Sequence, residues 1–223
     1  MLDILYEDEA LIFINKPAGL VVQQRMFNPE EAFLHDLVAR HTSPAFLMQR
    51  LDRGTSGVIF FSKQSDLNVR LTRQFERKRI RKHYLALCDG ELAERQTIDA
   101  PIARIGAIKF AVRDGGKRSI THVRPRSASA QGSLLDIDLE TGRTHQIRVH
   151  LSAIGHPLAG DWLYGENNAV RPMLHAAELE MTHPLTGQTL RVGAPPPEDF
   201  RDEARRRGIA SLEVDTTDTQ GYS

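Results

Sequence analysis

The segment Arg50-Leu51-Asp52-Arg53-Gly54-Thr55-Ser56-Gly57 runs directly into the apolar stretch Val58-Ile59-Phe60-Phe61. An unbroken run of β-branched and aromatic residues predicts a buried strand, and the two glycines predict a loop at its mouth. In this loop Asp52 lies between Arg50 and Arg53, and positive charge on both sides favours an ionised carboxylate. Asp52 is therefore either an anionic nucleophile or base, or a turn residue that caps its own backbone. On spacing alone the second interpretation is preferred.

The rest of the chain alternates short strands with a few helices. Period-two or continuous apolar patterns predict strands at 2–6, 10–15, 58–61, 84–88, 134–140 and 189–192. Apolar residues at helical spacing predict helices at 30–41, at 144–154, at 198–207, and after Ser65 as an N-cap. Residues 99–133 are predicted to form long hairpins or a mobile insertion. The pattern predicts an α+β fold with a mainly antiparallel mixed sheet and flanking helices.

Length and composition place the protein among ordinary globular proteins. Its 223 residues, 40% hydrophobic and 26% charged, fit one domain. We expect a catalytic domain over 1–208 and a disordered acidic tail over 209–223. The sequence contains neither an apolar stretch of membrane-spanning length nor an export signal at its start, and its one cysteine is Cys88. We therefore expect a cytoplasmic protein, a monomer with no membrane association and no obligatory protein partner.

Charge is segregated along the chain although the net charge is zero. Residues 63–82 and 102–126 are each rich in lysine and arginine, whereas 1–36 are acidic. Two basic tracts predict one positive face that can attract nucleic acid, with Arg73, Arg77 and Arg81 among the expected phosphate contacts. The alternative is a solvated helix face followed by a polar loop.

A second cluster of polar residues lies at 142–150. Arg143 is predicted at the start of a helix, where free N–H groups also favour an anion, and Arg148 lies on another face that can reach a pocket. His145, His150 and His156 do not share one helical face, so no metal site is predicted and hydrogen-bonding or core roles are favoured.

Several motifs together resemble, in order, those of the RluA family of pseudouridine synthases, in a short form without an N-terminal RNA-binding domain. The matching segments are Asn15–Gly19, Arg50–Asp52 with Thr55–Gly57, Arg81–Tyr84, Thr141–His150, Gly155–Asp161 and Leu174–Ala176. Several motifs in one order are far more specific than any single pattern, so the resemblance reverses the preference for a merely structural Asp52.

The resemblance implies a role for each matching residue. Asp52 corresponds to the family's catalytic aspartate and Arg148 to the basic residue that pairs with it. Tyr84, which from its sequence context is either plain core or a base-stacking residue, corresponds to the tyrosine beside the target base. Leu174 corresponds to an apolar residue of the same pocket, and Arg50 to an arginine that fills the space left by the extruded nucleotide.

Two further positions concern substrate binding. Arg143 is expected to support the loop or contact an RNA phosphate. Gln49 stands where the family usually has histidine, and an amide keeps hydrogen-bonding capacity without the ability to carry charge. The resemblance implies the pseudouridine synthase fold and an isomerase that acts on uridine in rRNA or tRNA stem-loops. No cofactor is predicted, because the rearrangement consumes neither water nor redox equivalents.

Two other function classes compete with the isomerase. A non-enzymatic RNA-binding protein on the same scaffold would not need Asp52 to have an arginine partner in a pocket. A metal-dependent nuclease would need carboxylates and histidines clustered near Asp52, and the sequence shows none close by.

Overall fold

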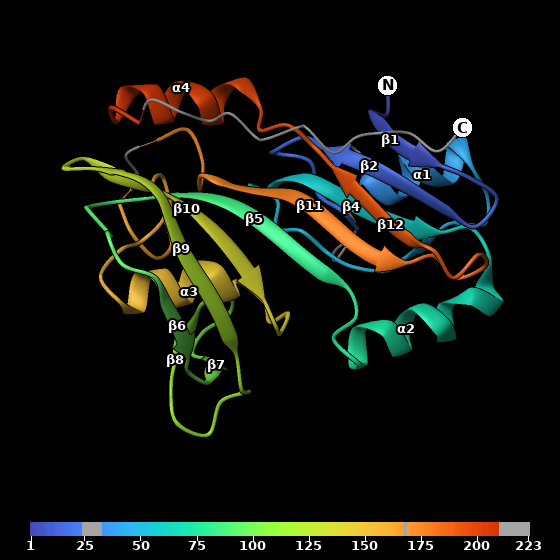
Figure 1. Ribbon diagram of the computed structural model, residues 1–223, viewed down its shortest axis with the longest axis horizontal. Helices are drawn as coiled ribbons and strands as arrows, with labels where there is room; N and C mark the ends of the chain where they lie inside the picture. Colours follow the sequence, from blue (N-terminus) through green and yellow to red (C-terminus); the bar gives the residue numbers. More distant parts are fainter. Residues whose placement is uncertain (24–32, 167–168, 210–223) are drawn as a thin grey trace.

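The computed structural model of the protein describes residues 1–23, 33–166 and 169–209, which form an α+β fold around a mixed, mainly antiparallel sheet of ten strands. Its principal strand order is β1-β2-β4-β11-β5-β10-β9-β6, with β3 pairing with β4 and β12 with β11, while β7 and β8 form a separate hairpin. The strands are β1 (Ile4–Glu7), β2 (Leu11–Lys16), β3 (Phe46–Leu47), β4 (Ser56–Ser62), β5 (Arg81–Cys88), β6 (Gln96–Asp99), β7 (Ile102–Arg104), β8 (Phe110–Val112), β9 (Ile120–Ser129), β10 (Gly132–Leu139), β11 (Leu174–Thr182) and β12 (Thr189–Gly193). Strands β5 and β11 run through the middle of the molecule (Figure 1).

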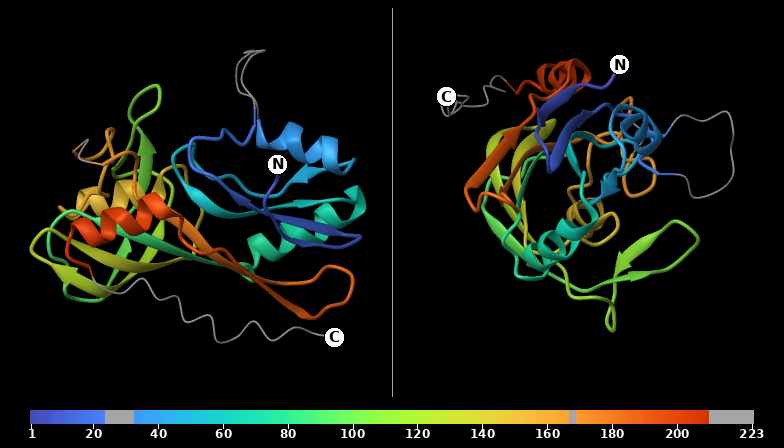
Figure 2. Two further views of the ribbon diagram at one scale, coloured as in Figure 1. Left: turned by 90° about the horizontal axis from the view of Figure 1, so that it is seen from above. Right: turned by 90° about the vertical axis from the view of Figure 1, so that its right-hand side faces the viewer.

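Four α-helices among the described residues cover the sheet. They are α1 (Leu34–His41), α2 (Asn68–Glu76), α3 (Gln146–Ala153) and α4 (Glu198–Arg206). Helices α1 and α3 share one core cluster with the inward side chains of β2, β4, β5 and β10, whereas α2 and α4 contribute to clusters on the opposite face. Helices α1 and α2 lie over one half of the molecule, and α3 and α4 over the other (Figure 2).

The apolar run that follows Asp52 forms the fully buried strand β4. It pairs with β2 on one side and, in parallel, with β11 on the other, and Ser56 to Ser62 are buried throughout. Gly57 is required at the junction with β11, because its φ is +107° and a Cβ there would lie 2.1 Å from the Ala176 carbonyl oxygen. The loop that carries Asp52 is thus anchored at the centre of the sheet.

The structure decides one alternative and corrects two details of the predicted elements. Residues 99–133 form hairpins rather than a mobile insertion: they contain the β7–β8 hairpin and β9, which pairs with β10 in the main sheet. Ser65 is the first residue of a 3-10 turn (Ser65–Leu67) and does not cap α2. Helix α3 begins at Gln146 rather than at Thr144, because His145 has a left-handed backbone with φ 57°.

The packed region extends at least one residue beyond the expected boundary. Ile209 is 2% exposed and packs in the cluster that includes Phe200 of α4, so it does not belong to a disordered tail. Residues 210–223 lie outside the described part of the chain, as do 30–32 of the predicted first helix. No helix of the described residues combines the length and apolar character of a membrane span.

Candidate active site

Asp52 lies in the loop between β3 and β4, where two buried cations hold the backbone of the following residues. Lys16, fully buried at the end of β2, donates from Nζ to the carbonyl oxygens of Pro17 (2.8 Å), Leu20 (3.0 Å) and Arg53 (3.3 Å). Burial, and then the nearby charge of Arg171, lower the pKa of Lys16 to about 7. Three carbonyl acceptors match the three N–H donors of an ammonium group and oppose this shift.

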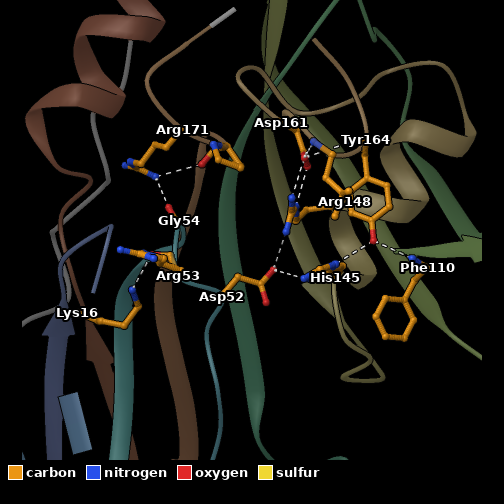
Figure 3. Close-up of polar contacts among 12 residues, drawn as sticks. Lys16, Asp52, Arg53, Gly54, Phe110, His145, Arg148, Asp161, Tyr164 and Arg171 are labelled. Atoms are coloured by element: carbon orange, nitrogen blue, oxygen red, sulfur yellow. Dashed lines mark hydrogen bonds and ion pairs between the residues drawn. The ribbon is translucent and has the colours of Figure 1, made fainter. Parts of the chain in front are cut away.

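The second cation is Arg171, which holds the next peptide of the loop. Its Nη1 donates to the Gly54 carbonyl oxygen at 3.0 Å, while its Nε and Nη2 form a two-point ion pair with Asp199 of α4. Lys16 and Arg171 thus bind the carbonyl groups of two successive residues, and both lie on the side of the loop away from the Asp52 side chain (Figure 3). The backbone that follows Asp52 is therefore held by two buried side chains from outside the loop.

Arg148 of α3 reaches the Asp52 carboxylate from the other half of the molecule. Its Nη1 lies 3.3 Å from Asp52 Oδ2, and its Nε and Nη2 each donate to Asp161 at 2.7 Å. The Arg148 side chain is 7% exposed and that of Asp161 is 0% exposed, whereas Asp52 is 31% exposed. Burial alone would lower the pKa of Arg148, but Asp161 and then Asp52 raise it above the usual arginine value. Arg148 is therefore a permanent cation that faces an accessible carboxylate.

His145 contacts Asp52 on the same side as Arg148, and Tyr164 contacts the other ring nitrogen of His145. His145 Nε2 lies 3.7 Å from Asp52 Oδ2, and its Nδ1 lies 2.8 Å from the Tyr164 hydroxyl oxygen. That oxygen accepts a hydrogen bond from the Phe110 backbone N–H at 3.0 Å, and the Phe110 ring packs edge-on against His145. The Tyr164 ring also lies under the Arg148 guanidinium, 5.0 Å from ring centroid to Cζ. All four side chains lie on the same side of Asp52, and His145 and Arg148 face its carboxylate (Figure 3).

Tyr84 and Leu174 both lie in the core cluster of the α1 and α3 face, and Leu174, unlike Tyr84, does not line the cleft. Tyr84 is 8% exposed and also lines the cleft, so core packing and an aromatic surface for a base are compatible at this position. Burial and the nearby Asp52 charge raise the pKa of the Tyr84 phenol far above its ordinary value, so the hydroxyl stays protonated. Leu174, 5% exposed, pairs through β11 with Ala86 of the same strand as Tyr84.

The cleft around Asp52 is lined by polar and basic residues from both halves of the molecule. Arg50 is exposed at its wall, and Gln49 donates to the Val58 carbonyl oxygen of β4 at 3.3 Å. Arg143 is exposed on the opposite wall, where its charge, after the larger effect of burial, lowers the pKa of Lys82. Lys82 and Arg143 therefore lie close enough to interact, and both line the cleft that contains Asp52.

The structure brings one of the three arginines predicted in the first basic tract to this cleft. Arg81 lines the cleft and pairs with Glu180 at 3.4 Å. Arg73 and Arg77 do not line it; they are exposed on and just after α2, which packs on the opposite face of the sheet. Whether these three arginines contact RNA stays a prediction.

Ion pairs reduce the positive face expected from residues 102–126. Arg118 pairs with Asp99, Arg124 with Asp138 and Arg126 with Asp136, at 3.0, 2.9 and 2.7 Å. In the register of β9 and β10, Arg124 lies directly opposite Asp136, so each of these two ion pairs is a diagonal cross-strand contact, which the local charge count cannot indicate.

The histidines of the second cluster behave as hydrogen-bonding residues. His150 is fully buried between Thr121 and the Ala100 carbonyl, and His156 contacts the Asp89 carbonyl oxygen at 3.0 Å. No group of three or more histidine, cysteine or acidic residues within 1–23, 33–166 and 169–209 could hold a metal ion.

Sequence reasoning did not assign roles to four residues that support the site. Lys16 and Asp161 lie inside two of the motifs that resemble the family, so their positions in the sequence could have indicated a role at the site. Tyr164 and Arg171 stand outside those motifs. Their only local signal is a tyrosine and an arginine in glycine- and proline-containing turns, which is too common to indicate a site.

Comparison with known proteins relates this arrangement to one family. The family model described as RNA pseudouridylate synthase matches residues 10–153. A ribosomal large subunit pseudouridine synthase D from Nitrosomonas europaea is 42% identical over 217 residues, which cover 89% of this chain and 63% of that protein. An uncharacterized RNA pseudouridine synthase, YhcT, from Bacillus subtilis is 37% identical, with 92% of this chain and 72% of that protein covered. The chain thus spans about two thirds of the length of these relatives.

A solved structure shares the fold over most of both chains. Human RNA Pseudouridylate Synthase Domain Containing 1 superposes with a TM-score of 0.75 at 28% sequence identity, covering 88% of this chain and 84% of that chain.

Proposed function

The chain belongs to the RNA pseudouridine synthase family, and from this premise we propose that it isomerises specific uridines in structured ribosomal RNA to pseudouridine. The observation that carries the proposal is the contact between Asp52 and Arg148, which joins an accessible carboxylate to a buried, fixed guanidinium at 3.3 Å. Ribosomal RNA is favoured over transfer RNA because relatives at 35–42% identity are called ribosomal large subunit pseudouridine synthases.

The proposed reaction is an isomerisation whose atoms balance within the substrate. The bond between N1 and C1′ breaks, the uracil rotates, and C5 forms a new bond to C1′. C5 then loses a proton and N1 gains one, so neither water nor a redox partner is consumed. Asp52 acts as an anion, either by attack at C1′ or by removal of a ribose proton.

Arg148 keeps that anion in place without neutralising it fully. Two of its nitrogens are bound to Asp161, and only Nη1 is directed at Asp52. Because Arg148 shares its charge with Asp161, it orients the Asp52 carboxylate and stabilises the negative charge only in part. The Asp52 carboxylate therefore keeps basicity with which to act on the ribose. Tyr84, protonated and buried under the cleft, offers an apolar ring for the uracil.

A uridine within folded RNA reaches Asp52 only after it leaves its stack. Extrusion costs a few kcal/mol, which phosphate contacts and stacking in the pocket offset. Lys82 and Arg143 in the cleft, with Arg50 on the other wall, are the residues we assign to these contacts. Catalytic function is assigned to the domain 1–208.

The proposal is tested by replacing Asp52 with Asn in the full chain. Asp52→Asn keeps the shape of the side chain and removes its charge, so pseudouridine formation on ribosomal RNA should be abolished. RNA affinity should change little, because phosphate contacts carry most of the binding. Asp66→Asn, an exposed aspartate in the 3-10 turn before α2, is the matched control and should leave turnover unchanged.

Base-resolution mapping of pseudouridine, with and without the protein, identifies the substrate. Sites lost only in transfer RNA would overturn the ribosomal assignment. RNA binding by the wild type with no pseudouridine at any site would favour a non-enzymatic RNA-binding protein. Undiminished pseudouridine formation by Asp52→Asn would reject the role of Asp52.

A further inference from the structure

His145 occupies a backbone conformation that side chains other than glycine rarely adopt. Its φ of 57° places it in the left-handed region immediately before α3. Such a residue costs free energy relative to an ordinary backbone and persists where the surrounding structure requires it. Here the turn directs the imidazole toward Asp52, with Nε2 at 3.7 Å from Oδ2 (Figure 3).

The hydrogen bonds on the other side of the ring select one protonation state. The Phe110 backbone N–H can only donate, so the Tyr164 oxygen accepts from it at 3.0 Å. The Tyr164 hydroxyl proton is then directed to the remaining hydrogen-bond neighbour that the described residues offer this oxygen, His145 Nδ1 at 2.8 Å. A nitrogen that accepts this proton carries none itself, so the neutral ring bears its hydrogen on Nε2.

We propose that His145 is a positioning residue for the reaction: its Nε2–H group donates to Oδ2 of Asp52, and the relay Phe110–Tyr164–His145 keeps that proton directed at the carboxylate. This inference rests on the proposed isomerase function and deepens it. At 3.7 Å the contact is longer than a hydrogen bond, and it shortens when substrate closes the site, as catalytic contacts in unliganded enzymes commonly do.

The relay determines which carboxylate oxygen faces the substrate. Within the described part of the chain, Arg148 and His145 both approach Oδ2 of Asp52, which leaves Oδ1 for the ribose. Two donors of fixed direction on one oxygen define the rotation of the carboxylate about its own axis, which Arg148 alone would not do. A neutral donor also orients Asp52 without adding a second full positive charge beside Arg148.

The most selective variant is Tyr164→Phe, which removes one hydroxyl and keeps the ring beneath Arg148. We expect kcat to fall about tenfold, equivalent to the loss of one hydrogen bond, with KM unchanged. Tyr6→Phe, which removes a hydroxyl bonded to Asp8 on β1, is the matched control and should leave both constants unchanged. His145→Gln retains an N–H donor at similar reach and should preserve more activity than His145→Leu.

A spectroscopic measurement tests the relay independently of turnover. In the wild-type protein, nitrogen NMR of the His145 ring should show a pyrrole-type Nε2 and a pyridine-type Nδ1, and Tyr164→Phe should populate the other tautomer. A wild-type ring with hydrogen on Nδ1, equal kcat in Tyr164→Phe and wild type, or equal activity in His145→Gln and His145→Leu would overturn the proposal. A wild type that forms no pseudouridine would refute the function instead, and the NMR result would still decide the tautomer.

Discussion

Asp161→Asn should destabilise the protein by about 3 kcal/mol while changing the shape of the site very little. The Asp161 side chain is fully buried and binds Arg148, itself 7% exposed, through two 2.7 Å hydrogen bonds. It also accepts the backbone N–H groups of Leu163 and Tyr164. Asparagine can keep the last two bonds, but its NH2 group faces an Arg148 donor and its charge is gone.

The size of the effect follows from the burial of Arg148. Removing one partner of a buried ion pair costs about 3–5 kcal/mol, because the other charge is left uncompensated. Asp52 remains 3.3 Å from Arg148 and retains part of the compensation, so the lower end applies. For a domain of this size, about 3 kcal/mol lowers Tm by roughly 6–12 °C.

The assay combines denaturant unfolding with single-turnover kinetics on ribosomal RNA. Pseudouridine formation should fall together with stability, because Arg148 is no longer held toward Asp52. The double variant Asp161→Leu with Arg148→Met should regain most of the stability and none of the activity, since an apolar pair can replace a buried ion pair. Asp99→Asn, which removes an exposed partner of Arg118, should leave the midpoint unchanged. A loss below about 1 kcal/mol in Asp161→Asn, or full activity in that variant, would refute the reasoning.

Two further predictions concern the sheet. Gly57→Ala should destabilise the fold by more than about 3 kcal/mol, because Gly57 has a φ of +107° and an added Cβ would lie 2.1 Å from the Ala176 carbonyl oxygen. Soluble Gly57→Ala protein with an unchanged unfolding midpoint would contradict this prediction. His83 should stabilise the protein at low pH: burial alone would lower the pKa of this imidazole, but hydrogen bonds to Asp136 and Asp138 raise it to about 9 from 6.5. The difference in unfolding free energy between wild type and His83→Gln should therefore be largest below pH 6.5. It should fall by up to about 3 kcal/mol as the pH rises to about 9. Urea unfolding across that range measures this difference, and a difference that does not vary with pH would rule the effect out.

Much of the fold follows from local patterns in the chain. Strands β2, β4, β5 and β10 and helix α4 lie where period-two or helical spacing predicts them, because their apolar residues must face a core on one or both sides. The predicted ends of helices and strands were less accurate where the backbone angle of a single residue decides where the element begins. The left-handed His145 delays the start of α3, and periodicity carries no signal for that angle.

The sequence by itself determined the helices, the strands with clear apolar patterns and the motifs that contain Asp52, Arg148 and Tyr84, since each depends on residues within about ten positions of one another. It did not predict β6 or β11. Only the tertiary structure decided which charges meet. Arg148 contacts Asp52 across 96 positions, and Asp161 becomes fully buried behind it. It also decided which basic residues share a face, as Lys82 lines the cleft whereas Arg73 lies on the far side of the sheet. The physical reason is that packing of the two halves of one sheet sets these long-range distances, and packing is a property of the whole chain.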